Sequence, residues 1–457
     1  MKFSPASLLL LLASLGACRL AAADLPSNPS SMAEDSQDAQ PIQSLTLADA
    51  RATALRNHPH FATAQIQAMI SQEIVREARS GFFPTIEAYG TGVDAGNENT
   101  RILAGGLNNP SIYDRVAGGV GASQLITDFG HTSNLTAGSK LEARADARNV
   151  EATREQILLN VDVAYFATLQ DQALLQVARQ TMAARQFLVD QVSALAAHQL
   201  KSQLDVSFSE VALEEARLLL QKSEGDADSA QASLAMALGF GAGSSGPDRP
   251  PATLRWQPVE PAPRPAPPPD IPTAIALALR DRPDLLGLRD QRDAATRFAN
   301  AEKDLGYPTV SAVGTVGDAI QHDYHLPGHY AAGGIMLDVP LFTGGLYAAR
   351  QRAAVLKAQA ADEDVRDAED HVTRDVQVAW LNLRTADQRL VTTERLLSHA
   401  VQADQLAQAR YKVGSSSIVE LSDAEVDRTS AEIAEAGARY DTLIARSILD
   451  YQMGALR

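Results

Sequence analysis

Cysteine is almost missing from this chain of 457 residues, because Cys18 is the only one. A single cysteine excludes a disulfide within the chain, a zinc site made of cysteines and a cysteine-ligated iron–sulfur cluster. Basic residues are outnumbered, with 40 Lys and Arg against 56 Asp and Glu, and the net charge is −16. Nucleic acid is therefore excluded as the main partner, because a phosphate backbone selects basic surfaces. Aromatic residues make up only 5% of the chain, which is low for the core of a compact enzyme.

Catalytic motifs are missing as well. The sequence has no Gly-x-Ser-x-Gly elbow, no phosphate-binding loop and no His-Glu-x-x-His zinc motif. Three histidines, His322, His325 and His329, share one short segment, and imidazoles at this spacing are able to bind zinc or copper. Histidines in loops more often form ordinary polar surface, so we expect no resident metal, no cofactor and no enzymatic activity.

Long hydrophobic runs are absent beyond the N-terminus, where residues 7–17 form an apolar stretch that follows the basic Lys2. This stretch is shorter than the about 20 residues of a transmembrane helix and is typical of a signal peptide, which we place at residues 1–23. Two processing sites fit the sequence. Cleavage after Ala23 suits an ordinary signal peptidase, whereas Leu-Gly-Ala before Cys18 suits a lipobox, in which Cys18 is lipidated. In either case the chain is exported.

The chain contains an internal duplication, in which the same order of segments occurs twice. A helix-like stretch with a proline, an aromatic–proline pair, a glycine-rich alternating segment and a second helix-like stretch recur in the same order. The pair Tyr307-Pro308 follows Phe83-Pro84 at the same offset by which Pro283 follows Pro59. Between the two copies lies a segment that holds eleven of the 22 prolines and favours an extended linker. The predicted units are a first repeat at 24–246, the linker at 247–272 and a second repeat at 273–457.

Proline-free tracts rich in Ala, Leu, Gln, Glu and Arg predict a long helical hairpin in each repeat. Each first helix is roughly 100 Å long at 1.5 Å per residue, and a helix of this length requires a coiled-coil partner. Shorter segments with alternating apolar residues and many glycines predict two strands per repeat. The expected strands are residues 84–96, 114–128, 308–320 and 329–343, and the expected hairpins are residues 131–238 and 345–453.

Four strands per chain are too few to close a barrel, because bacterial barrels have eight or more strands. An open sheet edge is not able to face lipid. If these strands enter a membrane, several chains must therefore pool them. Three chains supply twelve strands and twelve hairpin helices. The expected fold class is mainly α with a membrane β-barrel part, namely a trimeric 12-stranded β-barrel continued by a long α-helical barrel.

Two motifs carry a resemblance to a known family. Residues 411–423 read Tyr-Lys-Val-Gly-Ser-Ser-Ser-Ile-Val-Glu-Leu-Ser-Asp, and residues 340–345 read Pro-Leu-Phe-Thr-Gly-Gly. The first resembles the periplasmic hairpin tip, and the second the exit from barrel to helix, of the outer-membrane efflux protein family, the TolC-like outer-membrane factors. With the duplicated plan, the resemblance covers residues 44–457. It implies a homotrimeric conduit in outer-membrane lipid, with its helices in the periplasm, which works with a periplasmic adaptor (membrane fusion) protein and an inner-membrane transporter of the RND or ABC type.

The resemblance also assigns roles to residues of the hairpins. Glu420 and Asp423 match the acidic ring at the entrance of the family's pore. Asp427 shares their helical face, because the three follow the spacing i, i+3, i+7. Rings of carboxylates favour cations, and a solvated helix face is the alternative interpretation. The implied adaptor contacts at the two tips are Leu200, Lys201, Ser202, Val413, Gly414 and Ser415. The candidate gate contacts are Arg410 and Tyr411.

The sequence leaves several alternatives open. Residues 125–130 (LITDFG) are similar to the branch of the family that secretes polypeptides, whereas lipidation of Cys18 favours the branch that expels drugs. Small-molecule efflux and type I protein secretion therefore both fit. A periplasmic coiled-coil structural lipoprotein without a pore explains the helices, but neither the strand pairs nor their duplication. Five aromatic residues at the strand–helix junctions fit an interfacial girdle or simple core packing: Phe82, Phe83, Tyr307, Phe342 and Tyr347.

Overall fold

The computed structural model describes seven stretches of the unit Ile42–Arg457. These are residues 43–93, 100–101, 111–112, 115–240, 256–260, 267–321 and 327–456. The predicted signal peptide with Cys18, much of the predicted linker, and the loop histidines His322 and His325 lie outside the described residues. Among the helices that are described, none is both long enough and apolar enough to cross a membrane.

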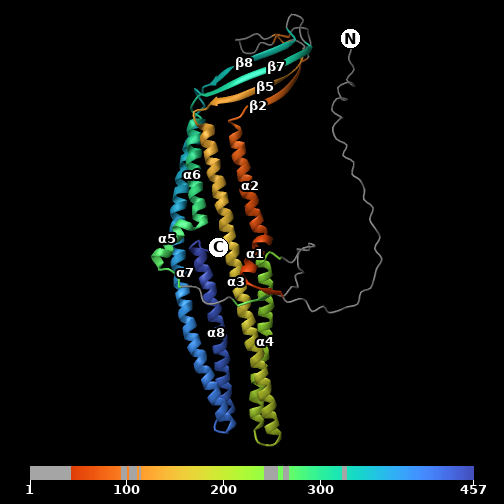
Figure 1. Cartoon of the computed structure of the whole chain (residues 1–457), viewed down its shortest axis with the longest axis vertical. Coiled ribbons are helices and arrows are strands. Elements are labelled where there is room, and N and C mark those ends of the chain that lie inside the picture. The colour runs from red at the N-terminus through yellow and green to blue at the C-terminus, as the bar shows by residue number, and fades with distance from the viewer. Residues whose placement is uncertain are drawn as a thin grey trace, which may run out of the picture. The chain divides into compact units, whose positions relative to one another are not determined.

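Four helices form two long antiparallel hairpins (Figure 1). They are α3 (His131–Ala197), α4 (Gln203–Ala237), α7 (Leu346–Lys412) and α8 (Ile418–Gln452). The first helix of each hairpin has 67 residues without a proline, so nothing interrupts its hydrogen-bond ladder. Four shorter helices are α1 (Leu47–Asn57), α2 (Pro59–Ser80), α5 (Ile271–Asp281) and α6 (Pro283–Asp304). Pro59 and Pro283 stand at the first position of α2 and α6, where a missing N–H costs no hydrogen bond.

The helices α2, α6, α4 and α8 lie along different parts of the two 67-residue helices, α3 and α7. Near the strands, α2 and α6 pack on α3, and α6 also packs on α7. Near the hairpin turns, α4 and α8 pack on α3, and α8 also packs on α7. The helix order is therefore α2-α3-α6-α7 on the strand side and α4-α3-α8-α7 on the turn side (Figure 1). The outer helices are α2 and α7 on the strand side, and α4 and α7 on the turn side.

One antiparallel sheet of four strands stands at the end of the hairpins away from their turns (Figure 1). Its order is β2 (Thr85–Val93), β5 (Arg115–Thr127), β7 (Thr309–Gln321) and β8 (His329–Asp338). The two repeats meet at β5 and β7, so β2 and β8 are the edges. Two small pairs complete the described strands: β1 (Gln43–Leu45) with β6 (Trp256–Pro258), and β3 (Thr100–Arg101) with β4 (Ser111–Ile112).

The last strand of the sheet is shorter than the sequence suggested. We expected it to reach residue 343, but β8 ends at Asp338. Pro340 has no N–H for a ladder hydrogen bond, and Gly344 and Gly345 adopt φ angles of +62° and +83° just before α7. Residues 340–345 therefore form the turn into α7, and the strand stops before them.

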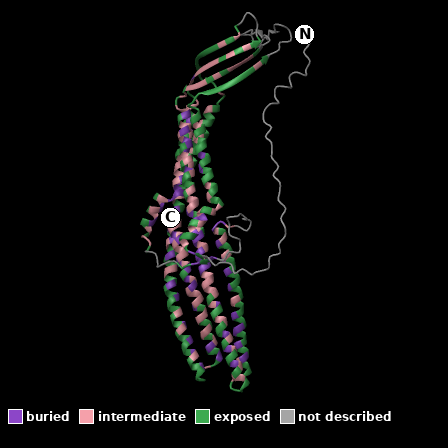
Figure 2. Cartoon of the chain, turned by 45° about the vertical axis from the view of Figure 1, so that its right-hand side comes forward, coloured by how far each residue is buried: buried purple, intermediate pink, exposed green. Residues whose placement is uncertain are grey.

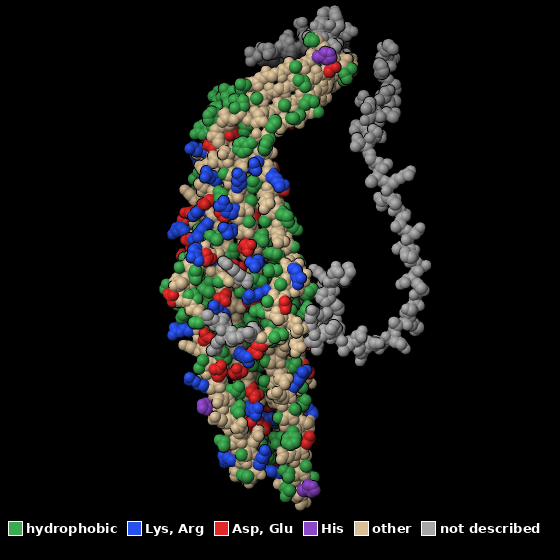
Figure 3. Space-filling view, viewed as in Figure 1, with side chains coloured by type: hydrophobic (Ala, Val, Ile, Leu, Met, Phe, Trp, Pro, Cys, Tyr) green, Lys and Arg blue, Asp and Glu red, His purple; other side chains and the backbone are tan. Residues whose placement is uncertain are grey.

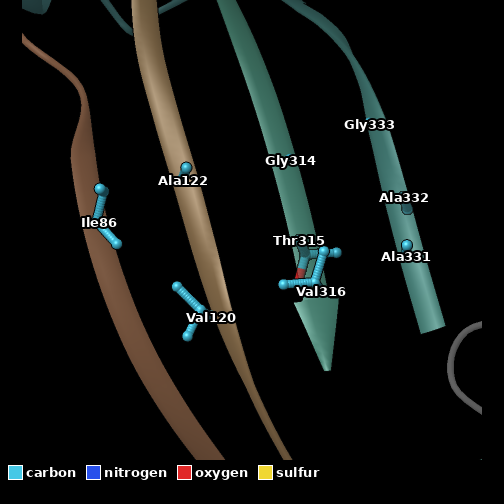
Figure 4. A pocket seen from close by; sticks show the side chains of 9 residues that line it. All are labelled: Ile86, Val120, Ala122, Gly314, Thr315, Val316, Ala331, Ala332 and Gly333. Atoms are coloured by element: carbon cyan, nitrogen blue, oxygen red, sulfur yellow. The ribbon is translucent and has the colours of Figure 1, made fainter. Parts of the chain in front are cut away.

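The two faces of the sheet differ in polarity, because successive side chains of a strand point to opposite sides. One face is apolar and carries Ile86, Val120, Val316, Ile335 and Leu337, of which Ile335 is 74% exposed. Figure 4 shows part of this face, a shallow apolar hollow lined by Ile86, Val120, Ala122, Val316 and Ala331 among others. The opposite face carries Glu87, Tyr89, Ser123, Thr315 and Asp338. A sheet of this kind suits lipid on one side and water on the other.

Charged side chains are distributed unevenly between the helices and the sheet. In the view of Figure 3, Lys, Arg, Asp and Glu gather over the helices, and few lie on the sheet. The buried residues of the helices lie mainly where the helices contact each other (Figure 2). Two core clusters lie in the middle of the hairpins, one around Tyr165 and Leu234 and the other around Val376 and Leu449.

Tyr165 and Trp380 stand at corresponding positions of α3 and α7, and each hydrogen-bonds to chain segments that precede or join the two repeats. The Tyr165 hydroxyl lies 2.6 Å from the carbonyl oxygen of Val259 and 2.8 Å from that of Leu45. The indole N–H of Trp380 donates to the carbonyl oxygen of Pro269 over 2.9 Å. In each case an aromatic side chain with a polar tip packs against a core cluster and also anchors a segment outside the hairpins.

Candidate functional site

The turns of both hairpins lie together at the end of the helices opposite the sheet (Figure 1). A small core cluster joins the four helices there. It consists of Leu188, Val192, Val206, Ala407, Tyr411, Ile418 and Leu421. The structure therefore brings the two predicted adaptor-contact tips and the predicted gate residues into one region.

The first turn, residues 198–202, is fixed by local hydrogen bonds. The Ser202 hydroxyl accepts from the Asp205 N–H over 3.1 Å, and the Asp205 carboxylate accepts from the Ser202 N–H over 3.1 Å. This capping box begins α4. Leu200 is exposed at the turn. Lys201 reaches back instead, with its Nζ 4.1 Å from the ring centroid of Tyr411, a cation–π contact that ties the two tips together.

The second turn, residues 413–417, depends on a glycine. Gly414 has a φ of +75°, in the left-handed region that other residues rarely adopt. The Ser415 N–H donates to the carbonyl oxygen of Arg410 over 2.9 Å, which closes the helix end, and Ser417 accepts from the Glu420 N–H to begin α8. Val413 is 78% exposed, so the tip presents an apolar side chain next to the exposed backbone of Gly414.

The three predicted ring carboxylates lie in the first turns of α8. Glu420, Asp423 and Asp427 are all exposed and share one helical face. The Arg410 guanidinium donates to Glu420 over 2.6 Å, so the predicted gate residue Arg410 partly neutralises the first carboxylate. Tyr411, in contrast, is buried, and its hydroxyl has no hydrogen-bond partner within the described chain.

Sequence reasoning missed a set of buried charges next to this face. Arg185 of α3 is only 4% exposed and forms an ion pair with Glu425 of α8. It also lies 3.4 Å from the hydroxyl of Ser422. Burial raises the pKa of Glu425, and Asp404 raises it further, whereas Arg185 lowers it. The pair links the first hairpin to the second.

A second ion pair, in which only the carboxylate is buried, lies within the second hairpin. Asp404 of α7 is 1% exposed and accepts from the Arg428 guanidinium over 2.9 Å and from the Gln408 amide over 3.0 Å. A signal for both pairs was present in the sequence. Glu425 and Arg428 continue the core spacing of Ile418 and Leu421 along α8, so polar residues occupy positions of a coiled-coil seam.

The other candidates lie away from the tips. His329 stands on β8, with its Nδ1 3.4 Å from Asp318. No group of three or more potential metal ligands gathers in the described ranges of the chain. Four of the five junction aromatics are exposed, and Tyr347 is half-buried. The tips thus carry exposed carboxylates on α8, two small exposed turns and ion pairs between helices.

The outer membrane efflux protein family model matches residues 50–240 and 274–455, which is most of both halves. Outer membrane efflux protein BepC of Brucella suis is 24% identical over 413 residues, covering 89% of this chain and 84% of BepC. The outer membrane protein VceC of Vibrio cholerae superposes with a TM-score of 0.75 at 18% identity over 89% of this chain and 96% of VceC. The CmeC outer membrane channel of Campylobacter jejuni gives 0.76 at 14% identity, covering 95% and 94%.

These matches confirm the resemblance, the mainly helical fold class with its strands and the outer-membrane location expected from the sequence. The likeness to the solved channels shows the fold, and the match of both halves shows the family. The chain is an outer-membrane protein and belongs to the outer membrane efflux protein family.

Proposed function

We propose that this protein is the exit duct of a tripartite export system. In this proposal a homotrimer passively conducts cargo from an inner-membrane transporter across the periplasm and the outer membrane. One observation carries the proposal: within the described residues, the sheet and the helices end on the same two sides of the chain. The end elements are β2 and β8 in the sheet, α2 and α7 beside it, and α4 and α7 toward the tips, with α5 packed on α7 near Val376.

The sheet supports closure by copies of the same chain. The edge strands β2 and β8 have no further strand beside them among the described residues. Their backbone groups require partners if the apolar face of the sheet meets lipid. Pairing β2 of one copy with β8 of the next satisfies both edges, and three copies then give a closed barrel of twelve strands.

The outer helices support the same closure, because they expose apolar residues at helical spacing. The exposed residues of α2 are Ile66, Met69, Ile70 and Ile74. Those of α4 are Leu204, Phe208, Val211 and Leu218. Those of α7 include Leu356, Val378, Leu381, Leu396 and Leu406. Stripes of this kind are typical of helices that pack against a partner. In a trimer α7 of one copy lies against α2 and α4 of the next.

The length of the helices supports a role across the periplasm. Helices of 67 residues place the turns roughly 100 Å from the sheet. The tips are then the part that a periplasmic adaptor is able to reach, with Leu200, Val413 and Gly414 exposed on them. The transporter behind the adaptor supplies the energy, in keeping with the missing catalytic motifs.

The proposal is tested with purified protein in detergent and in planar lipid bilayers. We expect a trimer that resists SDS at room temperature, becomes monomeric on heating, and forms conducting channels. A monomer without channel activity would favour the periplasmic structural protein instead.

The carboxylates at the tip are expected to select cations. Replacing Glu420 and Asp423 by Ala should lower the cation-to-anion permeability ratio about twofold or more, because three copies of each carboxylate surround the entrance. Reversal potentials in a salt gradient measure the ratio. Glu210→Ala removes an exposed carboxylate from α4 and serves as the matched control. Equal potentials for the double variant and the wild type would contradict the acidic ring.

We propose small molecules, such as drugs and other toxic compounds, as the first class of cargo, because the aligned relative BepC carries the name of an efflux protein. Type I secretion of polypeptides is the second candidate, favoured by residues 125–130. Deleting the gene and screening for both drug susceptibility and missing secreted proteins separates the two.

A further inference from the structure

Two tyrosines from opposite edges of the sheet meet above its centre. Tyr330 on β8 donates from its hydroxyl to the hydroxyl of Tyr89 on β2 over 3.1 Å. The Tyr89 hydroxyl is also hydrogen-bonded to the hydroxyl of Thr315 on β7. The Tyr330 hydroxyl lies 3.3 Å from the carbonyl oxygen of Gly118 on β5. This chain of hydroxyls therefore touches all four strands.

The residues of the sheet beneath the two tyrosine rings are small enough to allow this contact. Tyr89 pairs with Gly119, Gly119 with Gly317, and Gly317 with Tyr330, so the four residues form one line across the sheet. A Cβ atom at Gly119 would stand 2.6 Å from the Tyr330 hydroxyl and 2.9 Å from that of Tyr89. A Cβ at Gly317 would overlap the Tyr330 ring. The rings are able to lie against the sheet only because both inner positions are glycine.

The position of this contact gives it a mechanical role. The edge strands lie three strand spacings apart, about 14 Å, and ladder hydrogen bonds connect only neighbouring strands. The tyrosine pair connects the two edges directly. It lies on the polar face of the sheet, which faces the lumen if the apolar face meets lipid. A tie across one face limits how far the sheet is able to flatten.

We propose that Tyr89 and Tyr330 form a cross-brace that sets the curvature of the four-stranded sheet and so presents β2 and β8 at the angle at which neighbouring copies close the barrel. This inference rests on the proposed trimer. Curvature matters because strand number, tilt and stagger must agree for a barrel to close. A sheet braced before assembly loses less conformational freedom when the copies meet.

The test uses the full-length protein with Tyr89→Phe, Tyr330→Phe and the double variant. These changes keep both rings and remove only the hydroxyls. The temperature at which half of the trimer becomes monomer in SDS should fall by about 5 °C for each single variant. The double variant should fall by clearly less than the sum of the two single variants, because each single change already removes the hydrogen bond between Tyr89 and Tyr330. Thr91→Val removes a hydroxyl two residues along β2, on the same face as Tyr89, and should leave the temperature unchanged.

A pair of glycine variants tests the floor of the brace. Gly317→Ala should lower the dissociation temperature at least as much as the double Phe variant, because a methyl group displaces the Tyr330 ring. Gly90→Ala on β2 meets open space and is the matched control. Unchanged or strictly additive temperatures in the Phe series overturn the brace. A wild type that never forms a trimer overturns the proposed function instead, so the two failures are distinguishable.

Discussion

Replacing Gly414 by Arg is expected to abolish export while the outer membrane retains its normal amount of heat-modifiable trimer. Gly414 lies at the exposed tip of the second hairpin, and a Cβ atom added there meets no atom within 4 Å apart from its neighbours along the chain. The arginine would therefore project from the tip into the space where we place the adaptor. The tip core around Tyr411 and Ile418 stays intact. Accumulation of a fluorescent cargo measures export, and immunoblots of outer-membrane fractions measure the trimer.

The control for this change separates docking from backbone strain. Gly414 has a φ of +75°, so any other residue there is strained, but Asn tolerates this region far better than most. Gly414→Asn should keep at least about half of the export. If Asn and Arg abolish export equally, the conformation of the turn matters and the docking role is wrong. Normal export by the Arg variant would contradict the docking role directly.

The repeated anchors explain why much of the fold class was readable from the sequence. Proline is tolerated at the first position of a helix and in few other places of regular structure, so Pro59 and Pro283 mark helix starts. The missing prolines in the long tracts indicate uninterrupted helices in the same way. Gly414 and Ser417 also carry local signals, because a left-handed turn and an N-cap each demand particular residues. These features depend on neighbours along the chain.

The features that were missed depend on residues far apart in the sequence. The spacing along α8 places Glu425 in the seam, but its partner Arg185 is determined by the register in which α3 packs on α8, which no local pattern states. Tyr89 and Tyr330 meet because β5 and β7 separate their strands in a particular order. A glycine-rich strand shows that something approaches closely, but it does not show what. Contacts of this kind require the three-dimensional arrangement.

Glu155 on α3 is the carboxyl whose protonation is most disturbed by the fold. It is 9% exposed and lies where α6 begins and α8 ends. Burial, followed by the charges of Asp284 and Glu151, raises its pKa to about 7, although two arginines oppose the shift. The charged groups around it are Glu151, Arg154, Arg282, Asp284 and Tyr451. Since the folded state binds this proton more tightly than the unfolded chain does, the stabilisation is complete below about pH 4.5 and is lost as the pH rises through 7.

Replacing Glu155 by Gln is therefore expected to stabilise the protein at pH 8, by about 2 kcal/mol after allowance for solvent screening, or about 4 °C in the unfolding temperature of the helices. At pH 4.5 the variant and the wild type should agree, because both side chains are then neutral. Circular dichroism melting curves between pH 4.5 and 8 measure the difference. Asp190→Asn removes an exposed carboxylate 35 residues further along α3, outside the charges that act on Glu155, and should keep the pH profile of the wild type. If the Gln variant is no more stable than the wild type at pH 8, the charge of Glu155 does not destabilise the region where α3, α6 and α8 meet.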